Sequence, residues 1–237
     1  MTLPVRAPYG TPVTPAKPGF TVRITDIAAL RPDGSTVLGQ RKIPSLPIFE
    51  RAFTAFAQGT VFKSDTGHVA VEDLQPGDWL ETADGDKEQV TWIGSCPIAP
   101  AEQENPLTLT RIMADSFGMS RPDNFLGLGP AARLLQTPAD LRGSSLCDRM
   151  MTSASQFQDG MNVIEVMPAT PLRLFHVSMR RHTALIANGL PVESYHPGEN
   201  PVTHLSPTLK TAFLGLFPHI ENLSDFGPVN FTYAPER

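Results

Sequence analysis

Histidine is the residue type whose grouping first suggests chemistry in this sequence. Five of the six histidines lie in the last third of the chain, at His176, His182, His196, His204 and His219. Histidine can bind zinc or transfer protons, but a zinc site needs ligands at short, regular spacings, and these spacings match no such pattern. The sequence therefore favours histidines in turns and in the core, and it indicates no metal site.

Carboxylates and thiols are the other candidate groups. The acids between Glu72 and Glu88 could be paired catalytic carboxylates, but they lie in Pro-Gly-Asp and Asp-Gly-Asp sequences, which are typical of turns. The two cysteines, Cys96 and Cys147, are too few for a disulfide framework and lack metal-ligand spacing. We expect both to be reduced thiols, and the sequence indicates no cofactor.

The elements that would position these residues are short and rich in β structure. Between Ala55 and Gly94 the chain holds strand-like runs at residues 59–62, 69–71, 79–82 and 89–93. Turns with Asp-Gly or Pro-Gly separate them, and glycine supplies the positive φ that tight hairpins need. With 24 prolines and 18 glycines, the composition favours many short elements. The sequence therefore predicts an all-β fold, with Trp79 and Trp92 as core residues or cross-strand partners.

Further elements are predicted outside this segment. Alternation of apolar and polar residues indicates strands at residues 20–25, 107–112, 163–166, 172–179 and 182–187. Residues 136–160 are polar and in part serine-rich, which predicts a surface excursion. One helix is expected near the C-terminus, because Ser206 can cap it, Pro207 suits its first position and Pro218 stops it. Its apolar face would carry Leu209, Ala212, Phe213 and Leu216.

The ends of the chain and its charge exclude several classes of function. Residues 1–20 contain five prolines, which predicts an extended arm. The first residues lack a hydrophobic signal core, and no apolar run approaches the length of a bilayer span, so we expect no membrane partner and a cytoplasmic protein by default. The net charge is −5 and no Lys/Arg block is present, which argues against a nucleic-acid surface.

The ordered motifs of the chain resemble those of the Hint (hedgehog/intein) superfamily, in particular the bacterial Hint-like domains. They are Gly-Thr, Val-Glu-Asp-Leu-x-Pro-Gly-Asp, Trp-Ile-Gly, Arg-His, Ala-Asn-Gly and Glu-Ser-x-His-Pro-Gly. The resemblance covers residues 49–200 and implies a β-dominated horseshoe of short strands and hairpins. Residues 1–48 would then form an N-terminal arm and strand, and residues 201–237 a C-terminal helix and tail.

The resemblance also implies where chemistry would occur. Hint domains cleave or rearrange a peptide bond at their own N-terminal edge, and the Cys or Ser nucleophile of the first block falls here on Ala55. The histidine that protonates the leaving nitrogen falls on Ala132, in the weaker match of residues 129–135. The third block keeps His182 and Asn188. The resemblance predicts that Ala55 and His182 line one pocket.

Other positions of the family site depart from its pattern as well. Arg180 stands where relatives often have an acid, and it would disfavour a protonated His182 through like-charge repulsion. The closing His-Asn pair of inteins corresponds to Glu193-Ser194, so no asparagine cyclisation is expected. Thr54 is one residue out of register for a nucleophile and Cys96 is far from the scissile edge, so structural roles are favoured for both.

Two functional hypotheses follow from the resemblance. The favoured one is a pseudoenzyme, a degenerate Hint-like module without self-cleavage that serves as a binding or structural scaffold, with an unidentified protein as its partner. The alternative is autoprocessing, either with a substitute nucleophile or in an active parent of which alanines at positions 55 and 132 are inactivating changes.

Overall fold

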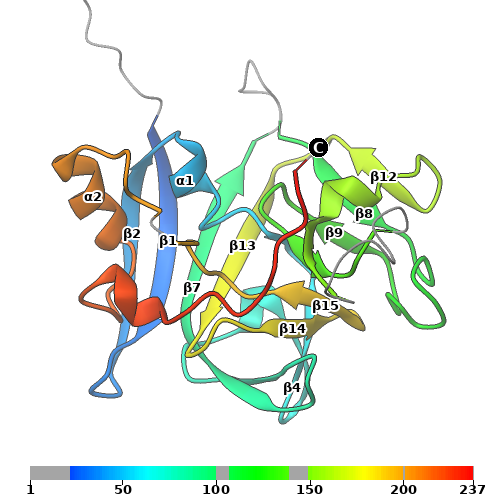
Figure 1. Cartoon of the computed structure of the whole chain (residues 1–237), viewed down its shortest axis with the longest axis horizontal. Coiled ribbons are helices and arrows are strands. Elements are labelled where there is room, and N and C mark those ends of the chain that lie inside the picture. The colour runs from blue at the N-terminus through cyan, green and yellow to red at the C-terminus, as the bar shows by residue number, and fades with distance from the viewer. Residues whose placement is uncertain (1–21, 100–106, 139–148, 200, 237) are drawn as a thin grey trace, which may run out of the picture.

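The structure is a computed structural model that describes residues 22–99, 107–138, 149–199 and 201–236. The predicted arm of residues 1–20 and Cys147 lie outside these ranges. The described residues form one antiparallel sheet of 15 strands with few helices, which confirms the expected all-β fold (Figure 1). The strands are β1 (Val22–Leu30), β2 (Thr36–Pro44), β3 (Phe56–Ala57), β4 (Val61–Ser64), β5 (Gly67–Ala70), β6 (Trp79–Glu81), β7 (Lys87–Ile98), β8 (Leu109–Ile112), β9 (Leu126–Leu128), β10 (Arg133–Leu135), β11 (Met151–Ser153), β12 (Val163–Val166), β13 (Leu172–Met179), β14 (Ala184–Ala187) and β15 (Leu190–Glu193). The α-helices are α1 (Pro47–Glu50) and α2 (Pro207–Leu214).

Strand β7 is the centre of the sheet. Its first residues pair with β6, and the rest pairs with β13 along one edge and with β1 along the other. Nearly every residue from Val90 to Ile98 is buried, because other elements cover both faces of this strand. Gly94 is required here, since a Cβ at this position would lie 2.2 Å from the Trp92 ring.

Two hydrophobic cores lie on either side of β7. The first contains Ala55, Phe56, Phe62 and Ala132, together with other residues between positions 55 and 192. The second surrounds Trp92, whose indole Nε1 donates a hydrogen bond of 2.8 Å to the carbonyl of Leu216. Residues of β1, β2 and the segment around α2 complete this second core: Ile27, Ala29, Ile43, Phe213, Leu216 and Phe217. The N-terminal strands and the C-terminal helix therefore pack against the central segment (Figure 1).

Several predicted elements match the observed ones. Strand β13 spans the predicted residues 172–179, and β8, β12 and β14 lie within their predicted ranges. Helix α2 begins after Ser206, whose side chain accepts a hydrogen bond from the N–H of Leu209. Phe213 and Leu216 are buried as expected, but Ala212 is exposed because the short helix turns it toward solvent.

Other expectations were wrong. Residues 136–160 do not form only a surface excursion, because β11 lies within them and Met151 is fully buried. The expectation for the tryptophans was correct only for Trp92, which is a fully buried core residue, whereas Trp79 is 43% exposed and pairs with Gln89. Strands β2 and β15 were not anticipated.

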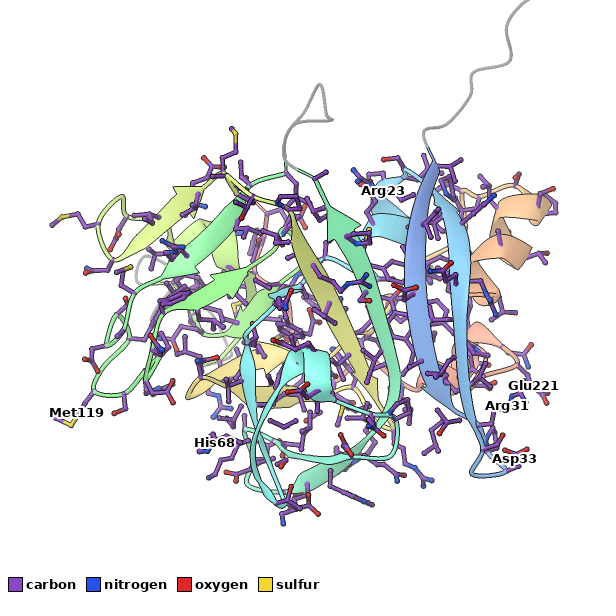
Figure 2. All side chains as sticks on the ribbon, turned by 180° about the vertical axis from the view of Figure 1, so that it is seen from behind. Arg23, Arg31, Asp33, His68, Met119 and Glu221 are labelled. Carbon is purple, nitrogen blue, oxygen red and sulfur yellow. The ribbon has the colours of Figure 1, made fainter. Side chains whose placement is uncertain are left out.

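Hairpin tips extend from the sheet into solvent. Figure 2 shows His68 on the β4–β5 hairpin and Met119 at the end of the loop before β9, which is 91% exposed. Arg31 and Asp33 mark the tip of the β1–β2 hairpin, and Glu221 lies near them. No helix in the four described ranges is long and apolar enough to span a membrane.

Candidate functional site

The peptide between Thr54 and Ala55 is held by hydrogen bonds from two directions. The Thr54 carbonyl oxygen accepts a hydrogen bond of 3.1 Å from the N–H of Ala131, and the Ala55 N–H donates one of 3.0 Å to the Phe175 carbonyl. The next carbonyl, that of Ala55, accepts from the N–H of Gly129 at 2.7 Å. The Ala55 methyl group is completely buried. This peptide is therefore fixed in position and has its polar groups paired.

Ala132 lies in the turn that makes these contacts. Its N–H donates to the Gly129 carbonyl at 3.1 Å, and its side chain is in the same core cluster as Ala55. Gly129 must be glycine, because a Cβ there would lie 2.2 Å from the Thr54 oxygen. The structure thus brings the segments of Ala55 and Ala132 together. Neither methyl side chain can attack a carbonyl or donate a proton.

The surroundings of Thr54 and Cys96 indicate structural roles for both side chains. The Thr54 hydroxyl donates a hydrogen bond of 3.0 Å to the Glu50 carbonyl at the end of α1. Cys96 is 1% exposed on β7, and burial raises the pKa of its thiol to about 11. A buried, protonated thiol is a poor nucleophile, since the thiolate is the reactive form.

His182 forms a charged network with Glu193. The backbone N–H of Asn230 donates to Nδ1 of His182, so the ring proton lies on Nε2 and points to Oε1 of Glu193 at 3.0 Å. Glu193 also receives the Tyr233 hydroxyl at 2.6 Å and the Arg133 guanidinium at 3.2 Å. The C-terminal tail, drawn in red in Figure 1, crosses beside β15 and contributes Tyr233 to this network.

The network controls the ionisation of its acid. Burial alone would raise the pKa of Glu193, but the hydrogen bond with His182 and the charge of Arg133 hold it below its ordinary value. The same burial, with the adjacent carboxylate, raises the pKa of the Tyr233 hydroxyl. Glu193 is therefore a buried carboxylate that its partners keep ionised.

The contact of Glu193 with His182 was not predicted from the sequence. The acid of the family pattern was expected at position 180, where the chain has Arg180, whereas the carboxylate that His182 meets comes from β15. The signal was present in the Asn188-Gly189 turn. A two-residue turn pairs Ala187 with Leu190 and hence Ala184 with Glu193, which brings Glu193 alongside the chain that leaves His182.

Asn188 lies in the turn between β14 and β15. It has φ +46°, and its Oδ1 accepts a hydrogen bond of 2.9 Å from the N–H of Val61. Its backbone N–H donates to the Val61 carbonyl at 2.8 Å. Asn188 thereby ties the β14–β15 hairpin to β4.

Ala55 and His182 are connected through intervening residues. The Ala55 carbonyl accepts a hydrogen bond from the N–H of Gly129, the turn continues through Ala132 to Arg133, and Arg133 pairs with Glu193, the partner of His182. The expectation that Ala55 and His182 line one pocket stays a prediction.

A cavity of about 400 Å³ lies beside Arg133 and Glu193. Its walls include Arg51, Ala131, Arg133, His176, Glu193 and Tyr195. The Nδ1–H of His176 donates to the Arg51 carbonyl at 2.8 Å, and burial lowers the pKa of His176 to about 4. The imidazole is therefore neutral near pH 7. Its Nε2 is buried without a hydrogen-bond partner among the described residues.

No group of three or more His, Cys, Asp or Glu side chains in the described part of the chain is arranged to hold a metal ion. His196 stacks beside His182 at 4.8 Å between ring centroids, but its Nε2 lies 3.1 Å from the Gly227 carbonyl and its Nδ1 accepts from the N–H of Gly198. Both of its nitrogens are therefore engaged with the backbone.

Comparison with known proteins gives a family match and several structural ones. A family model of the Hint domain matches residues 54–199. A bacterial intein-like domain from Clostridium thermocellum is 10% identical, with a TM-score of 0.42, and the match covers 60% of this chain and 99% of that one. A DnaB intein from Synechocystis sp. PCC 6803 is also 10% identical, with a TM-score of 0.34 and coverage of 60% and 98%. The comparison with curated proteins gives no match.

Proposed function

We propose, since the chain belongs to the Hint domain family, that it is a Hint-type module that does not cleave itself and that serves as a binding or structural scaffold. The observation that carries the proposal is the buried methyl group of Ala55 at the position of the family's nucleophile. An acyl shift needs a thiol or hydroxyl to attack the preceding carbonyl and an acid to protonate the leaving nitrogen. Ala55 and Ala132 supply neither group.

The surroundings of the Thr54–Ala55 peptide support the same role. Its carbonyl and its N–H are both hydrogen-bonded to backbone groups, which stabilises the intact peptide in the folded chain. The substitute nucleophiles are poorly placed for attack, because the Thr54 hydroxyl donates to the Glu50 carbonyl and the Cys96 thiol is buried and protonated.

One observation favours the second candidate function, autoprocessing in an active parent of this chain. The network of His182, Glu193, Arg133 and Tyr233 is complete, although a scaffold needs no buried ionised carboxylate. An active parent would have a nucleophile at position 55 and a histidine at position 132, with this network already in place.

Intact-mass spectrometry distinguishes the two functions. The freshly purified full-length chain is incubated at neutral pH, with and without dithiothreitol, and sampled over several days. We expect a single mass that corresponds to all 237 residues at every time point. A fragment that ends at Thr54, released with or without thiol, would contradict the scaffold proposal and identify a substitute nucleophile.

A further inference from the structure

We propose that the outer edge of β11 is a docking site for an extended segment of a partner protein, and that the C-terminal tail of the chain, residues 228–236, occupies this site in the absence of the partner. This inference rests on the proposed function, because it names the partner class of a scaffold whose own peptide stays intact. The partner segment carries an aromatic residue, any residue and a tyrosine in succession. The contacts of the tail with β11 and with Glu193 carry the inference.

The tail lies against β11 as an added strand would. Strand β11 is the last strand at this end of the sheet in the described ranges. On its outer side the N–H of Met151 donates a hydrogen bond of 2.9 Å to the Thr232 carbonyl, and the N–H of Ala234 donates one of 3.0 Å to the Met151 carbonyl. These two bonds form a parallel bridge between Met151 and Tyr233. Main-chain bonds of this kind supply affinity when an extended peptide adds to a sheet edge, and they do not depend on covalent attachment.

Two aromatic side chains of the tail provide the specificity. The Tyr233 hydroxyl donates a hydrogen bond of 2.6 Å to Oε1 of Glu193, and the Tyr233 ring centre lies 5.1 Å from Cζ of Arg133. Two positions earlier, Phe231 meets the His182 ring edge-on, with 5.2 Å between the ring centroids. Both aromatic rings also pack on one small hydrophobic cluster: Leu135, Met151 and Ala184. A partner segment therefore needs aromatic residues at these two positions.

The tyrosine hydroxyl is the decisive contact, because its acceptor is a buried carboxylate. Glu193 is 4% exposed, and its partners keep its pKa below the ordinary value, so the hydroxyl meets an ionised group. Hydrogen bonds to an ionised acceptor are roughly twice as strong as those between neutral groups. Phenylalanine in place of Tyr233 would leave Glu193 with one donor fewer. The site therefore distinguishes tyrosine from phenylalanine.

The tail is held less firmly at its other positions. Thr232 and Pro235 are exposed, and Glu236 is 68% exposed. Oε1 of Glu236 lies 3.6 Å from the nearest nitrogens of Arg51 and Arg133, which is too long for a hydrogen bond. Covalent attachment compensates for these weak contacts, because it gives the tail an effective concentration of roughly millimolar. A separate segment with the same aromatic pattern competes with the tail, and it gains when the contacts of the tail are weakened.

Fluorescence anisotropy tests the proposal on the full-length protein. The probe is a fluorescein-labelled peptide with the sequence of residues 228–236. We expect the Tyr233→Phe protein to bind the probe about tenfold more tightly than wild type, because its own tail lacks the hydroxyl and competes less well. A tail with a purely structural role would give no such gain of binding.

Two further protein variants accompany this comparison. Asn230→Ala removes the hydrogen bond of 2.7 Å to the His182 carbonyl, so it weakens the tail at a second point and should also bind the probe more tightly than wild type. Thr232→Ser, at an exposed position of the same tail, is the matched control and should bind the probe as wild type does.

Modified probes locate the bound peptide on the Tyr233→Phe protein. A probe with Tyr233→Phe should bind about tenfold more weakly, because it offers Glu193 no hydroxyl. A methyl group on the backbone nitrogen of Ala234 removes the donor to the Met151 carbonyl and should weaken binding about fivefold or more. The same methyl group on the nitrogen of Tyr233 is the matched control, since successive residues of an extended strand face opposite sides and this nitrogen points away from β11.

Each outcome has a defined meaning. No binding of millimolar probe by Tyr233→Phe or Asn230→Ala protein that unfolds cooperatively overturns the inference. Equal affinities for the two methylated probes overturn the location at β11, and equal affinities for the tyrosine and phenylalanine probes overturn the role of Glu193. A wild-type dimer in sedimentation that the probe dissociates identifies the tail of a second copy as the occupant and overturns a separate partner. The intact mass of the same samples reports on the proposed function separately, since a whole chain that binds no probe contradicts only this inference.

Discussion

The carbonyl oxygen of Thr54 lies 3.1 Å from the backbone nitrogen of Ala131, in a hydrogen bond that joins the N-terminal edge of the Hint-type segment to the turn before β10. Ala55 and Ala132, the two positions at which the family resemblance predicts a nucleophile and an acid, therefore lie on segments that touch. A nucleophile introduced at position 55 and an acid introduced at position 132 would lie on neighbouring segments.

We expect Ala55→Cys alone to give little cleavage and Ala55→Cys with Ala132→His to give thiol-dependent release of residues 1–54. An amide nitrogen leaves poorly without a proton, and general acid catalysis is worth on the order of 10²–10⁴ in rate. A dithiothreitol time course followed by intact mass measures both variants. A Cys96→Ser background is the control, because it removes the buried thiol without touching the Thr54–Ala55 peptide.

Adding Arg180→Asp to the variant with Ala55→Cys and Ala132→His should increase its rate of cleavage only slightly. Glu193 already supplies the acid that His182 meets, so a second carboxylate at position 180 has less to contribute than the sequence suggests. A folded double variant that remains uncut with or without Arg180→Asp would show that the match of the second block to Ala132 is wrong.

Glu193→Gln should destabilise the protein by about 3 kcal/mol at pH 7, because it removes the buried carboxylate that pairs with Arg133 and leaves that guanidinium only the exposed carboxylate of Glu236 at 3.6 Å. The folded pKa of Glu193 is lowered, so the stability that its ionisation provides is full above about pH 4.3 and is lost as the pH falls through the folded pKa. The difference in urea midpoint between wild type and variant should therefore shrink below pH 4.3. Glu165→Gln, an exposed acid on β12, should show no such difference at pH 7.

His176→Asn should flatten the dependence of stability on pH between about 6.5 and 4. Burial lowers the folded pKa of His176 to about 4, so the unfolded chain binds a proton that the folded chain refuses in this window. Wild type should lose up to about 3 kcal/mol there that the variant keeps. His68→Asn, on an exposed strand, is the control in the same urea titrations. Parallel curves for wild type and His176→Asn would contradict the assignment.

Gly129→Ala should destabilise the protein by about 3 kcal/mol or more, because the added methyl group would displace the Thr54 backbone. Gly215→Ala is the matched control, since its methyl group would meet the Thr211 oxygen at 3.3 Å and requires only a small adjustment. Thermal unfolding by circular dichroism compares the two. Equal melting temperatures would show that the backbone at Thr54 can move.

Residues 49–200 alone should fail to unfold cooperatively, although the family resemblance predicts a domain with these bounds. The fragment lacks Ile27, Ile43 and Phe213, so Trp92 loses much of its core. In a Trp79→Phe background, Trp92 emission should shift to longer wavelengths relative to residues 22–236. A blue-shifted, cooperative fragment would show that the bounds define an independent domain.

The sequence predicted elements best where one local rule decides them. Strand β13 was predicted over its full length from its own residue pattern, and it lies between Pro171 and two arginines. Strand β2 was missed, since its polar residues Gln40, Arg41 and Lys42 resemble a loop and only pairing with β1 makes them a strand. Such pairing is a long-range property that no local pattern contains.

The candidate site, too, could be predicted only in part from local sequence patterns. The positions of Ala55, Ala132 and His182 follow from short motifs, but the partners of His182 come from residues 11 and 48 positions further along the chain. The buried Nε2 of His176 could not be predicted, because it depends on which carbonyl the other ring nitrogen meets. Residue type gave the interpretation of histidines in turns and in the core, and only geometry shows that this nitrogen is buried without a hydrogen-bond partner among the described residues.

The tail that bonds to His182 and Glu193 has a consequence for synthesis on the ribosome. Asn230 and Tyr233 are made after every strand of the sheet, and until they leave the exit tunnel His182 lacks one hydrogen-bond donor and Glu193 another. Synthesis therefore supplies these two donors after the strands that carry the imidazole and the carboxylate. A nascent chain stalled shortly before Asn230 would expose a carboxylate and an imidazole that the finished protein buries.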